Sequence, residues 1–290
     1  LGYTDHGAAR IKSIELIPVE AFKTVTKSSL PELVAIPGGS FIMGGNDTNP
    51  DEAPAHEVTI SPFAIGKYEV TNAEYEQFDP SHKVHRDGFS WRDNEPVIYV
   101  SWKDAAKYCN WLSKKYGLKP VYDEKNWKAD MKADGFRLPT EAEWEYVATG
   151  RGQNRIYPWG NRKPTDDRGN FMLDKALSID PAMTASVKKG VMVRGSFPKG
   201  ASRDGVMDMA GNVGEWCTDY FNDYMPGKNT DPCDQRKSHH RVIRGGSWGY
   251  YNMSQRGKDR EFNNDGYPGY IYLGFRIAIS NAGYKKITRK

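Results

Sequence analysis

A segment near the C-terminus constrains this chain most, because two regular ends enclose an irregular middle. The ends, Arg241–Arg244 and Leu273–Ile279, are apolar and rich in β-formers, so each is predicted to be a strand. The middle, residues 249–272, has neither a helical nor a strand period, and 15 of its 24 residues are Gly, Tyr, Asn, Asp or Ser. That composition is typical of a loop and also of a paratope, where tyrosine supplies contact area and small polar residues supply hydrogen bonds. The pattern therefore predicts a rigid frame that presents a loop.

Composition narrows the class of protein. With 290 residues, a 38% hydrophobic fraction, 29 glycines and 17 tyrosines, the chain favours a loop-rich domain held by aromatic packing over a bundle of long helices. The net charge of +4 is small and the basic residues are scattered, so nucleic-acid binding has little support. No run is apolar and long enough to span a membrane. The chain does not begin with methionine, so a targeting segment ahead of Leu1 stays open.

The three cysteines make an odd count and match no zinc-binding spacing. Cys109 lies in an apolar stretch with helical periodicity, which predicts a thiol buried in the core. Cys217 and Cys233 either pair with each other or stay free.

Local signals predict short helices and strands. A Ser or Thr precedes three stretches with helical periodicity, and two of these caps have Glu three residues later, the capping-box position. The predicted helices are Asn72–Phe78, Trp102–Tyr116 and Glu141–Thr149. Leu33–Gly44 is predicted to be a hairpin that turns at Pro-Gly-Gly, and strands are expected at His56–Ile60 and Phe63–Val70. Residues 150–200 lack a strong period, which indicates a functional or metal-braced loop region.

Eight motifs follow one another in the order found in the formylglycine-generating-enzyme (sulfatase-modifying-factor) family, which this chain resembles over about residues 33–280. The motifs are Ile36–Gly44, Tyr68–Asn72, Val100–Trp102, Arg137–Tyr146, Tyr157–Gly160, Gly211–Trp216, Arg244–Trp248 and Gly274–Arg276. The resemblance implies a C-type-lectin-related α+β fold with little regular structure, twisted antiparallel sheets and two main helices. We therefore expect an N-terminal arm at 1–32, one domain at 33–280 and a C-terminal tail at 281–290.

The chemistry of that family is not expected here. Its enzymes oxidise a substrate cysteine with two cysteines that hold copper, and these lie between the last two motifs. Residues 249–272 contain no cysteine, and soft Cu(I) needs thiolate ligands, so no copper is expected. The iron site of the sulfoxide synthases lies in an added helical domain, and nothing in this sequence resembles that domain. The alternative is a divergent metal-dependent oxidoreductase, which convergence of three histidines from His56, His82, His85, His239 and His240 would favour.

A second resemblance within the same fold is to the variable proteins of diversity-generating retroelements, including spirochaete (treponemal) lipoproteins. Their C-terminal segment is mutagenised at adenines, which turns Asn codons into Asp, Gly, Tyr, Ser or His codons. The resemblance implies a non-enzymatic, ligand-binding lipoprotein of the cell surface or outer membrane. Its partner would be a variable protein or surface ligand, and it would meet the membrane only through a lipid anchor upstream of Leu1.

The residues expected to vary and to bind ligand are those of the segment that belong to this codon set. They are Gly249, Tyr250, Tyr251, Asn252, Ser254, Asn263, Asn264, Asp265, Gly266, Tyr267, Gly269, Tyr270 and Tyr272. Arg256, Arg260 and Phe262 between them are expected to be scaffold. Two alternatives stay open: an ordinary loop whose tyrosines pack on the frame, and an accessory protein without diversification.

Charged and aromatic residues around the segment are expected to build the frame. Arg244, Arg256, Arg260 and Arg276 are predicted to pair with buried carboxylates such as Glu215 or Glu145 rather than with ligand. Core positions are predicted for Trp144, Trp216 and Trp248, with an aromatic cage for a ligand as the alternative.

A calcium site is expected from the resemblance. Residues 208–215 supply two carboxylates and two glycines in a short, irregular stretch, and calcium takes hard oxygen ligands that include backbone carbonyls. The family places structural calcium on Asp208, Gly211, Val213 and Glu215, with Asn170 as the candidate for a second site. The alternative is a structural turn in which Glu215 meets an arginine.

Overall fold

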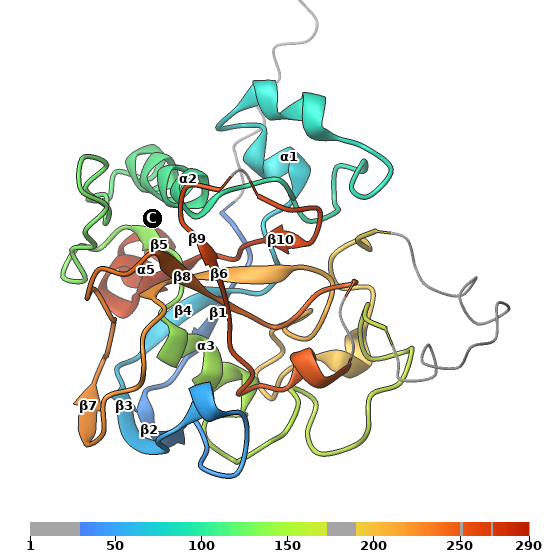
Figure 1. Ribbon diagram of the computed structural model, residues 1–290. Helices are drawn as coiled ribbons and strands as arrows, with labels where there is room; N and C mark the ends of the chain where they lie inside the picture. The colour runs from blue at the N-terminus through green and yellow to red at the C-terminus, as the bar shows by residue number, and fades with distance from the viewer. Residues whose placement is uncertain (1–29, 173–189, 250–251, 268, 290) are drawn as a thin grey trace, which may run out of the picture. The chain divides into compact units, whose positions relative to one another are not determined.

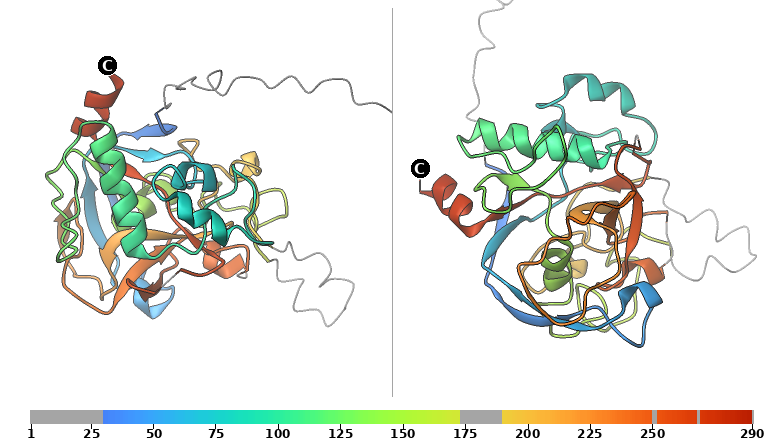
Figure 2. Two further views of the ribbon diagram at one scale, coloured as in Figure 1. Left: turned by 90° about the horizontal axis from the view of Figure 1, so that it is seen from above. Right: turned by 60° about the vertical axis from the view of Figure 1, so that its left-hand side comes forward.

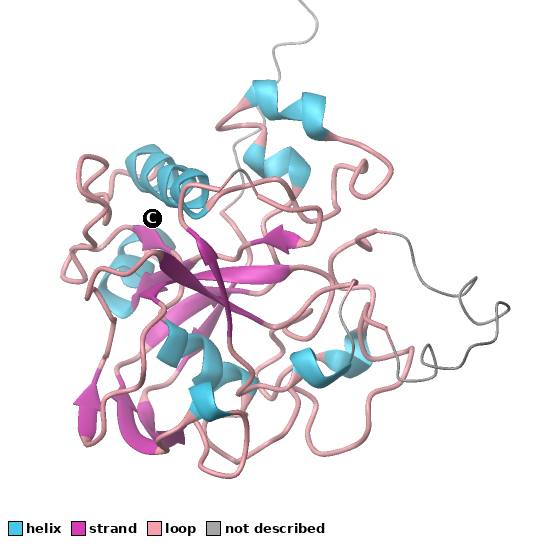
Figure 3. Ribbon diagram, viewed as in Figure 1, coloured by secondary structure: helices cyan, strands magenta, loops and turns pink. Residues whose placement is uncertain are grey.

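The computed structural model describes residues 30–172, 190–249, 252–267 and 269–289. The described residues from Glu32 onward belong to one compact unit. Loops connect short helices and strands throughout this unit, so the expected α+β fold with little regular structure is confirmed (Figure 3). None of the helices in the described ranges has the length and apolar character that crossing a lipid bilayer requires.

The strands of the described residues form three small sheets (Figure 1). The first has the order β1 (Leu33–Ile36), β4 (Phe63–Gly66), β11 (Ala278–Ser280), β5 (Phe136–Arg137). The second has the order β10 (Leu273–Gly274), β6 (Gly214–Tyr220), β8 (His240–Arg244), β9 (Glu261–Asn264). The third has the order β2 (Gly39–Met43), β3 (His56–Ile60), β7 (Lys228–Thr230). Pairing is antiparallel except for β10 with β6 and β3 with β7.

Two expectations about the strands are wrong. The predicted hairpin at Leu33–Gly44 does not form, because β1 pairs with β4 and β2 pairs with β3, in different sheets. The Pro-Gly-Gly turn instead carries the chain from one sheet to the next. The predicted strand Leu273–Ile279 is interrupted between β10 and β11, where the Phe275 and Ile277 carbonyls accept hydrogen bonds from the Val70 and Gly66 amides.

The helices begin where the caps predict. They are α1 (Asn72–Tyr75), α2 (Trp102–Lys115), α3 (Glu141–Ala148) and α5 (Asn281–Thr288), with 3-10 turns η2 (Pro50–Glu52), η3 (Pro80–His85), η5 (Pro198–Gly200) and η6 (Asn252–Gln255). Thr71, Ser101 and Thr140 each form a reciprocal capping box. The segment expected to be a tail, residues 281–290, instead contains α5, which Ser280 caps and whose Ile287 is buried.

Two apolar clusters make up most of the core. One lies around α2 and includes Trp102, Trp216 and Phe275, and the other lies around α3. Contacts with β2, β3, β6 and β8 place α3 in the interior, between two sheets (Figure 2). Cys109 and Cys217 are buried free thiols, Cys233 is a half-buried free thiol, and burial raises the pKa of all three.

The tryptophans of the core keep their ring N–H groups paired. Trp102 donates to the Cys217 carbonyl, Trp216 to the Val100 carbonyl and Trp144 to Glu215, over 2.7–3.0 Å. The expected core role is therefore confirmed for Trp144 and Trp216, whereas Trp248 is half-buried. A buried indole needs such a partner, because an unpaired N–H is costly away from water.

A fully buried ion pair joins the last strands to the centre of the fold. Arg276 donates from Nε and Nη2 to the Glu215 carboxylate over 2.5 and 2.6 Å, and Trp144 donates to the same group over 2.8 Å. The other Arg276 donors go to the Gly66 and Met207 carbonyls. Because both partners are desolvated and fully hydrogen-bonded, removing one leaves an uncompensated buried charge.

We expect Arg276→Leu to lower the free energy of unfolding by about 3–5 kcal/mol, because Glu215 then stays buried without a counter-ion. Lys67→Ala removes the exposed ion pair with Glu32 and is the matched control, for which a much smaller loss is expected because solvent screens this pair. Urea denaturation of both variants measures the difference. Equal losses would contradict the central position of the buried pair.

Candidate functional site

The segment 249–272 is tied to the frame at both ends. Gly245 and Gly246, with φ of +95° and +62°, form the turn after β8 in a conformation that favours glycine. Trp248 then donates from its backbone to the Asn212 carbonyl and from its ring to the Ile271 carbonyl, both over 3.0 Å. The ring bond joins the start of the segment to its end, so the segment is a closed loop on a fixed base.

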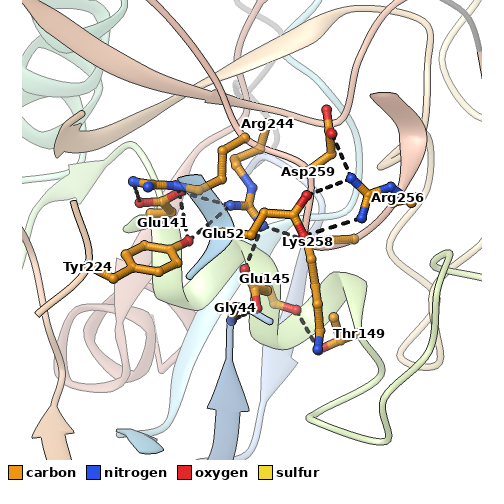
Figure 4. Close-up of polar contacts among 12 residues, drawn as sticks. Gly44, Glu52, Glu141, Glu145, Thr149, Tyr224, Arg244, Arg256, Lys258 and Asp259 are labelled. Carbon is orange, nitrogen blue, oxygen red and sulfur yellow. Dashed lines mark hydrogen bonds and ion pairs between the residues drawn. The ribbon is translucent and has the colours of Figure 1, made fainter. Parts of the chain in front are cut away.

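Two arginines in the middle of the segment form ion pairs with residues outside it. Arg256 pairs with Glu52 over 2.5 Å and with Asp259 over 2.9 Å (Figure 4). Arg260 donates to Glu141 of α3 over 2.7 Å and to the Asp51 carbonyl. These residues are scaffold, as predicted.

Arg244 at the end of β8 joins the same network. It donates to Glu141 over 2.8 Å, to Glu145 over 2.7 Å and to the Gly257 carbonyl over 2.7 Å (Figure 4). Burial opposes ionisation of Glu141, but the guanidiniums of Arg260 and Arg244 lower its pKa, so it stays ionised. With Arg276 on Glu215, the prediction that these arginines pair with carboxylates is confirmed.

Two carboxyls beside this network have raised pKa values. Burial, with the nearby Asp259 charge, raises the pKa of Glu261 to about 7. Burial raises the pKa of Asp259 itself to about 6, against the opposing charges of Arg256 and Arg244. The base of the loop thus holds ionisable groups that desolvation shifts towards neutrality.

The residues predicted to vary differ in exposure. Asn264, Gly266 and Tyr267 are exposed, and Asn263 and Asp265 are half-buried at the end of β9. Gly249, Ser254, Tyr270 and Tyr272 are half-buried, and Asn252 lies in η6. Tyr250 and Tyr251 lie outside the described residues. The exposed members therefore gather between β9 and β10.

One predicted position does not fit variation. Gly269 is buried, and a Cβ there would lie 2.4 Å from the Val100 nitrogen and 2.6 Å from its oxygen. The backbone of the loop approaches Val100 so closely that only glycine fits without a shift. Codon composition alone gave no sign of this tertiary contact.

Sequence reasoning missed residues that border the loop. Phe262, expected to be scaffold, is 50% exposed and packs against the rings of Phe221 and His240. Phe89 stacks on Trp248 with centroids 5.5 Å apart, and the Tyr99 amide donates to the Tyr270 carbonyl. Phe89 belongs to a polar stretch, where an aromatic residue was the available signal, whereas Tyr99 lies in the short apolar run 97–100 and gave none.

The calcium ligands predicted from the sequence fit only in part. Both Glu215 oxygens accept hydrogen bonds from Arg276, and one also accepts from Trp144, so Glu215 has the structural role kept as the alternative. Asn170 has a buried Oδ1 without a hydrogen-bond partner, while its Nδ2 donates to Gly190 and Asn212. Burial raises the pKa of Asp208 to about 6, and one of its oxygens accepts from the Gly195 amide.

The histidines of the described residues do not gather into one cluster. His82 and His85 lie with ring centroids 4.9 Å apart, His56 is bonded to the Pro54 carbonyl, and His240 packs on Phe262. Across the described ranges, no three His, Cys, Asp or Glu side chains converge in a way that holds a metal ion.

We expect Gly269→Ala to lower the free energy of unfolding by about 1–3 kcal/mol, because the new methyl group overlaps the Val100 backbone. Gly266→Ala is the matched control. Its methyl group would meet the Lys103 ammonium at 3.4 Å and Asn264 Oδ1 at 3.7 Å, both at the ends of flexible side chains, so a change within about 0.5 kcal/mol is expected. Chemical denaturation measures both, and equal stability of the two variants would mean that position 269 can vary.

Comparison with known proteins gives relatives of more than one kind. The chain is 29% identical to an inactive C-alpha-formylglycine-generating enzyme 2 of Mus musculus, covering 75% of this chain and 74% of that protein. It is 33% identical to the chaperone protein LppX of Paenibacillus barcinonensis, covering 75% of this chain and 78% of that protein.

A solved structure of similar fold is Treponema denticola variable protein 1, with a TM-score of 0.70 and 25% identity, covering 86% of this chain and 94% of that one. The family model for the sulfatase-modifying factor enzyme 1-like domain matches residues 18–281. That match spans most of the chain, and the ordered motifs and the observed fold agree with it. The chain therefore belongs to the sulfatase-modifying factor enzyme 1-like family.

Proposed function

We propose that this protein is a non-enzymatic, surface-displayed ligand-binding protein whose segment 249–272 is diversified by a retroelement. The observation that carries the proposal is that the segment contains two kinds of residue, some paired with the frame and some exposed. Arg256 and Arg260 form ion pairs with the frame. Asn264, Gly266 and Tyr267 are exposed to solvent. Similarity to Treponema denticola variable protein 1 supports the same assignment.

The physics of the frame suits diversification. A change at an exposed loop position removes few contacts, so its cost in stability is small. The network below the loop, from Arg244 and Arg260 to Glu141, does not depend on the exposed side chains. Loops of variable sequence on a fixed scaffold are the arrangement that antibodies use.

The lack of cysteine in residues 249–272 supports a role without the copper chemistry of the family's enzymes. The relatives include one protein described as inactive and one described as a chaperone, so membership of the family does not by itself bring the oxidase activity.

The genomic locus tests the proposal. We expect an imperfect repeat of the DNA that codes for residues 249–272, near a reverse-transcriptase gene, with differences confined to adenines of the repeat. Clones from a growing population should then differ at the codons of exposed residues and not at those of Arg256 or Arg260. A locus without a repeat, or differences scattered over all codons, would contradict diversification.

We also propose a structural calcium ion beside Asn170 and residues 208–213. The support is the buried Asn170 Oδ1, which has no hydrogen-bond partner. The backbone carbonyl of the same residue lies close to Gly211, where a Cβ would be 2.4 Å from its oxygen. Oxygen donors of this kind suit calcium. Asp208, Gly211 and Val213 are the further ligands proposed, and Glu215 is left out because Arg276 and Trp144 occupy it.

Calcium in excess of its dissociation constant should raise the melting temperature by about 5–10 °C over the value in EDTA, because it binds only the folded state. Asn170→Ala should remove this difference, and Asn264→Ala, on the exposed loop, should keep it. Thermal unfolding with and without EDTA measures all three proteins. Equal melting temperatures of the native protein in both conditions would rule out the calcium ion.

A further inference from the structure

Three tyrosines at the end of the segment form a stacked column. The rings of Tyr267 and Tyr270 have centroids 4.8 Å apart with planes 20° apart, and those of Tyr270 and Tyr272 are 5.0 Å and 6° apart. Offset stacks of this spacing are favourable. A hydrogen bond between the Tyr267 and Tyr270 side chains also raises the pKa of the Tyr267 hydroxyl. The outer ring is thus held by stacking on its neighbour.

The inner end of the column is fixed to the fold. Tyr270 and Tyr272 pack against the main apolar cluster. Their carbonyls accept hydrogen bonds from the Tyr99 and Gly214 amides. Tyr270 and Tyr272 therefore act as support, and a ligand that meets Tyr267 does not have to order the rings beneath it.

The outer face of Tyr267 is open. Tyr267 is 46% exposed although Tyr270 covers one face of its ring, so solvent reaches the ring away from that face. The adjacent Gly266 is exposed and has no side chain to obstruct that face. A further planar ring would extend the column at the same spacing.

The charges beside the column are already paired. Asp265 forms an ion pair with Lys103 over 3.2 Å, and the Lys103 ammonium also lies 5.9 Å from the Trp127 ring centre. The column therefore offers an incoming group a ring face beside a neutralised ion pair. That environment favours an uncharged aromatic ring over an ionic ligand.

The column lies outside two cavities of the described residues. Cavities of about 550 and 570 Å³ lie elsewhere, the first beside the β6–β8 connector and the second beside Gly44 and Thr149, and neither is lined by the three tyrosines. Sites for small molecules are concave and bury most of the ligand, whereas protein interfaces are flatter and use aromatic anchors. Because Tyr267 is exposed, a ring that stacks on it needs a larger body to supply further contacts.

We propose that the outer face of Tyr267 receives an aromatic side chain of a protein partner, with Tyr270 and Tyr272 as its rigid support. This inference rests on the proposed display function and names the chemistry of the ligand. It assigns most of the aromatic contact to one residue of the face, as central aromatic anchors often carry most of the binding energy.

The test uses the whole chain and N-acetyltryptophanamide as the probe, which presents a protein-like ring with capped ends. Side-chain NMR of the tyrosines should show a saturable shift of the Tyr267 ring signals on titration. Tyr267→Ala should abolish probe binding and Tyr267→Phe should keep it. Phe262→Ala, which removes another exposed aromatic ring, is the matched control and should leave binding unchanged.

Methyl β-glucoside, titrated in the same way, separates a sugar-binding platform from an aromatic one. Stronger shifts with the glucoside than with the indole probe would overturn the proposal. The absence of a saturable indole shift up to the solubility limit, or equal indole binding by Tyr267→Ala, would overturn it as well. None of these results depends on the genomic locus. The proposal for Tyr267 can therefore be rejected while diversification of the segment still holds.

Discussion

The fold of the C-terminal third depends on two carboxylates of one buried helix. Glu141 and Glu145 of α3 accept hydrogen bonds from Arg244 of β8. Glu141 also accepts a hydrogen bond from Arg260 in the segment that follows. Each of these charges lies in the interior, where an unpaired charge is expensive and a fully hydrogen-bonded pair is tolerated. Tyr270 and Tyr272 pack the end of the loop against the apolar core, and the ion pairs of Arg256 and Arg260 fix the position of its polar middle.

Exposure within the loop follows from this arrangement. The arginines point inward to α3, which leaves the stretch from Asn263 to Tyr267 at the surface beside the tyrosine column. Rigid aromatic rings with exposed small polar neighbours make an interface that costs little entropy to order. In the proposed contact, the half-buried Tyr270 and Tyr272 have a supporting role, because their rings stack beneath that of Tyr267.

Signals that act over a few residues allowed correct predictions from the sequence. The caps at Thr71, Ser101 and Thr140 place the helices, and the pairing of the arginines with carboxylates follows from the cost of burying charge. Family resemblance, carried by ordered motifs, gave the fold. Strand partners were not predictable, because β1 and β2 are neighbours in sequence but complete different sheets.

The site shows the same limit. The buried state of Gly269 depends on Val100, which is distant in sequence. For Glu215 the sequence left calcium and an arginine as alternatives, and the structure shows that Arg276 and Trp144 bind its oxygens. The α5 helix at the expected tail depends on a pocket for Ile287 that no local pattern reveals. A residue of the right codon type is therefore able to vary only if its backbone makes no such close contact.

Protease resistance of two displayed libraries tests the central claim most directly. One library randomises Asn263, Asn264 and Tyr267, and the other randomises Arg244, Arg256 and Arg260, three positions in each. If the ion pairs hold the frame and the exposed residues are free to change, most members of the first library fold and few of the second do. Similar losses of folded protein in both libraries would contradict the separation of frame from variable face.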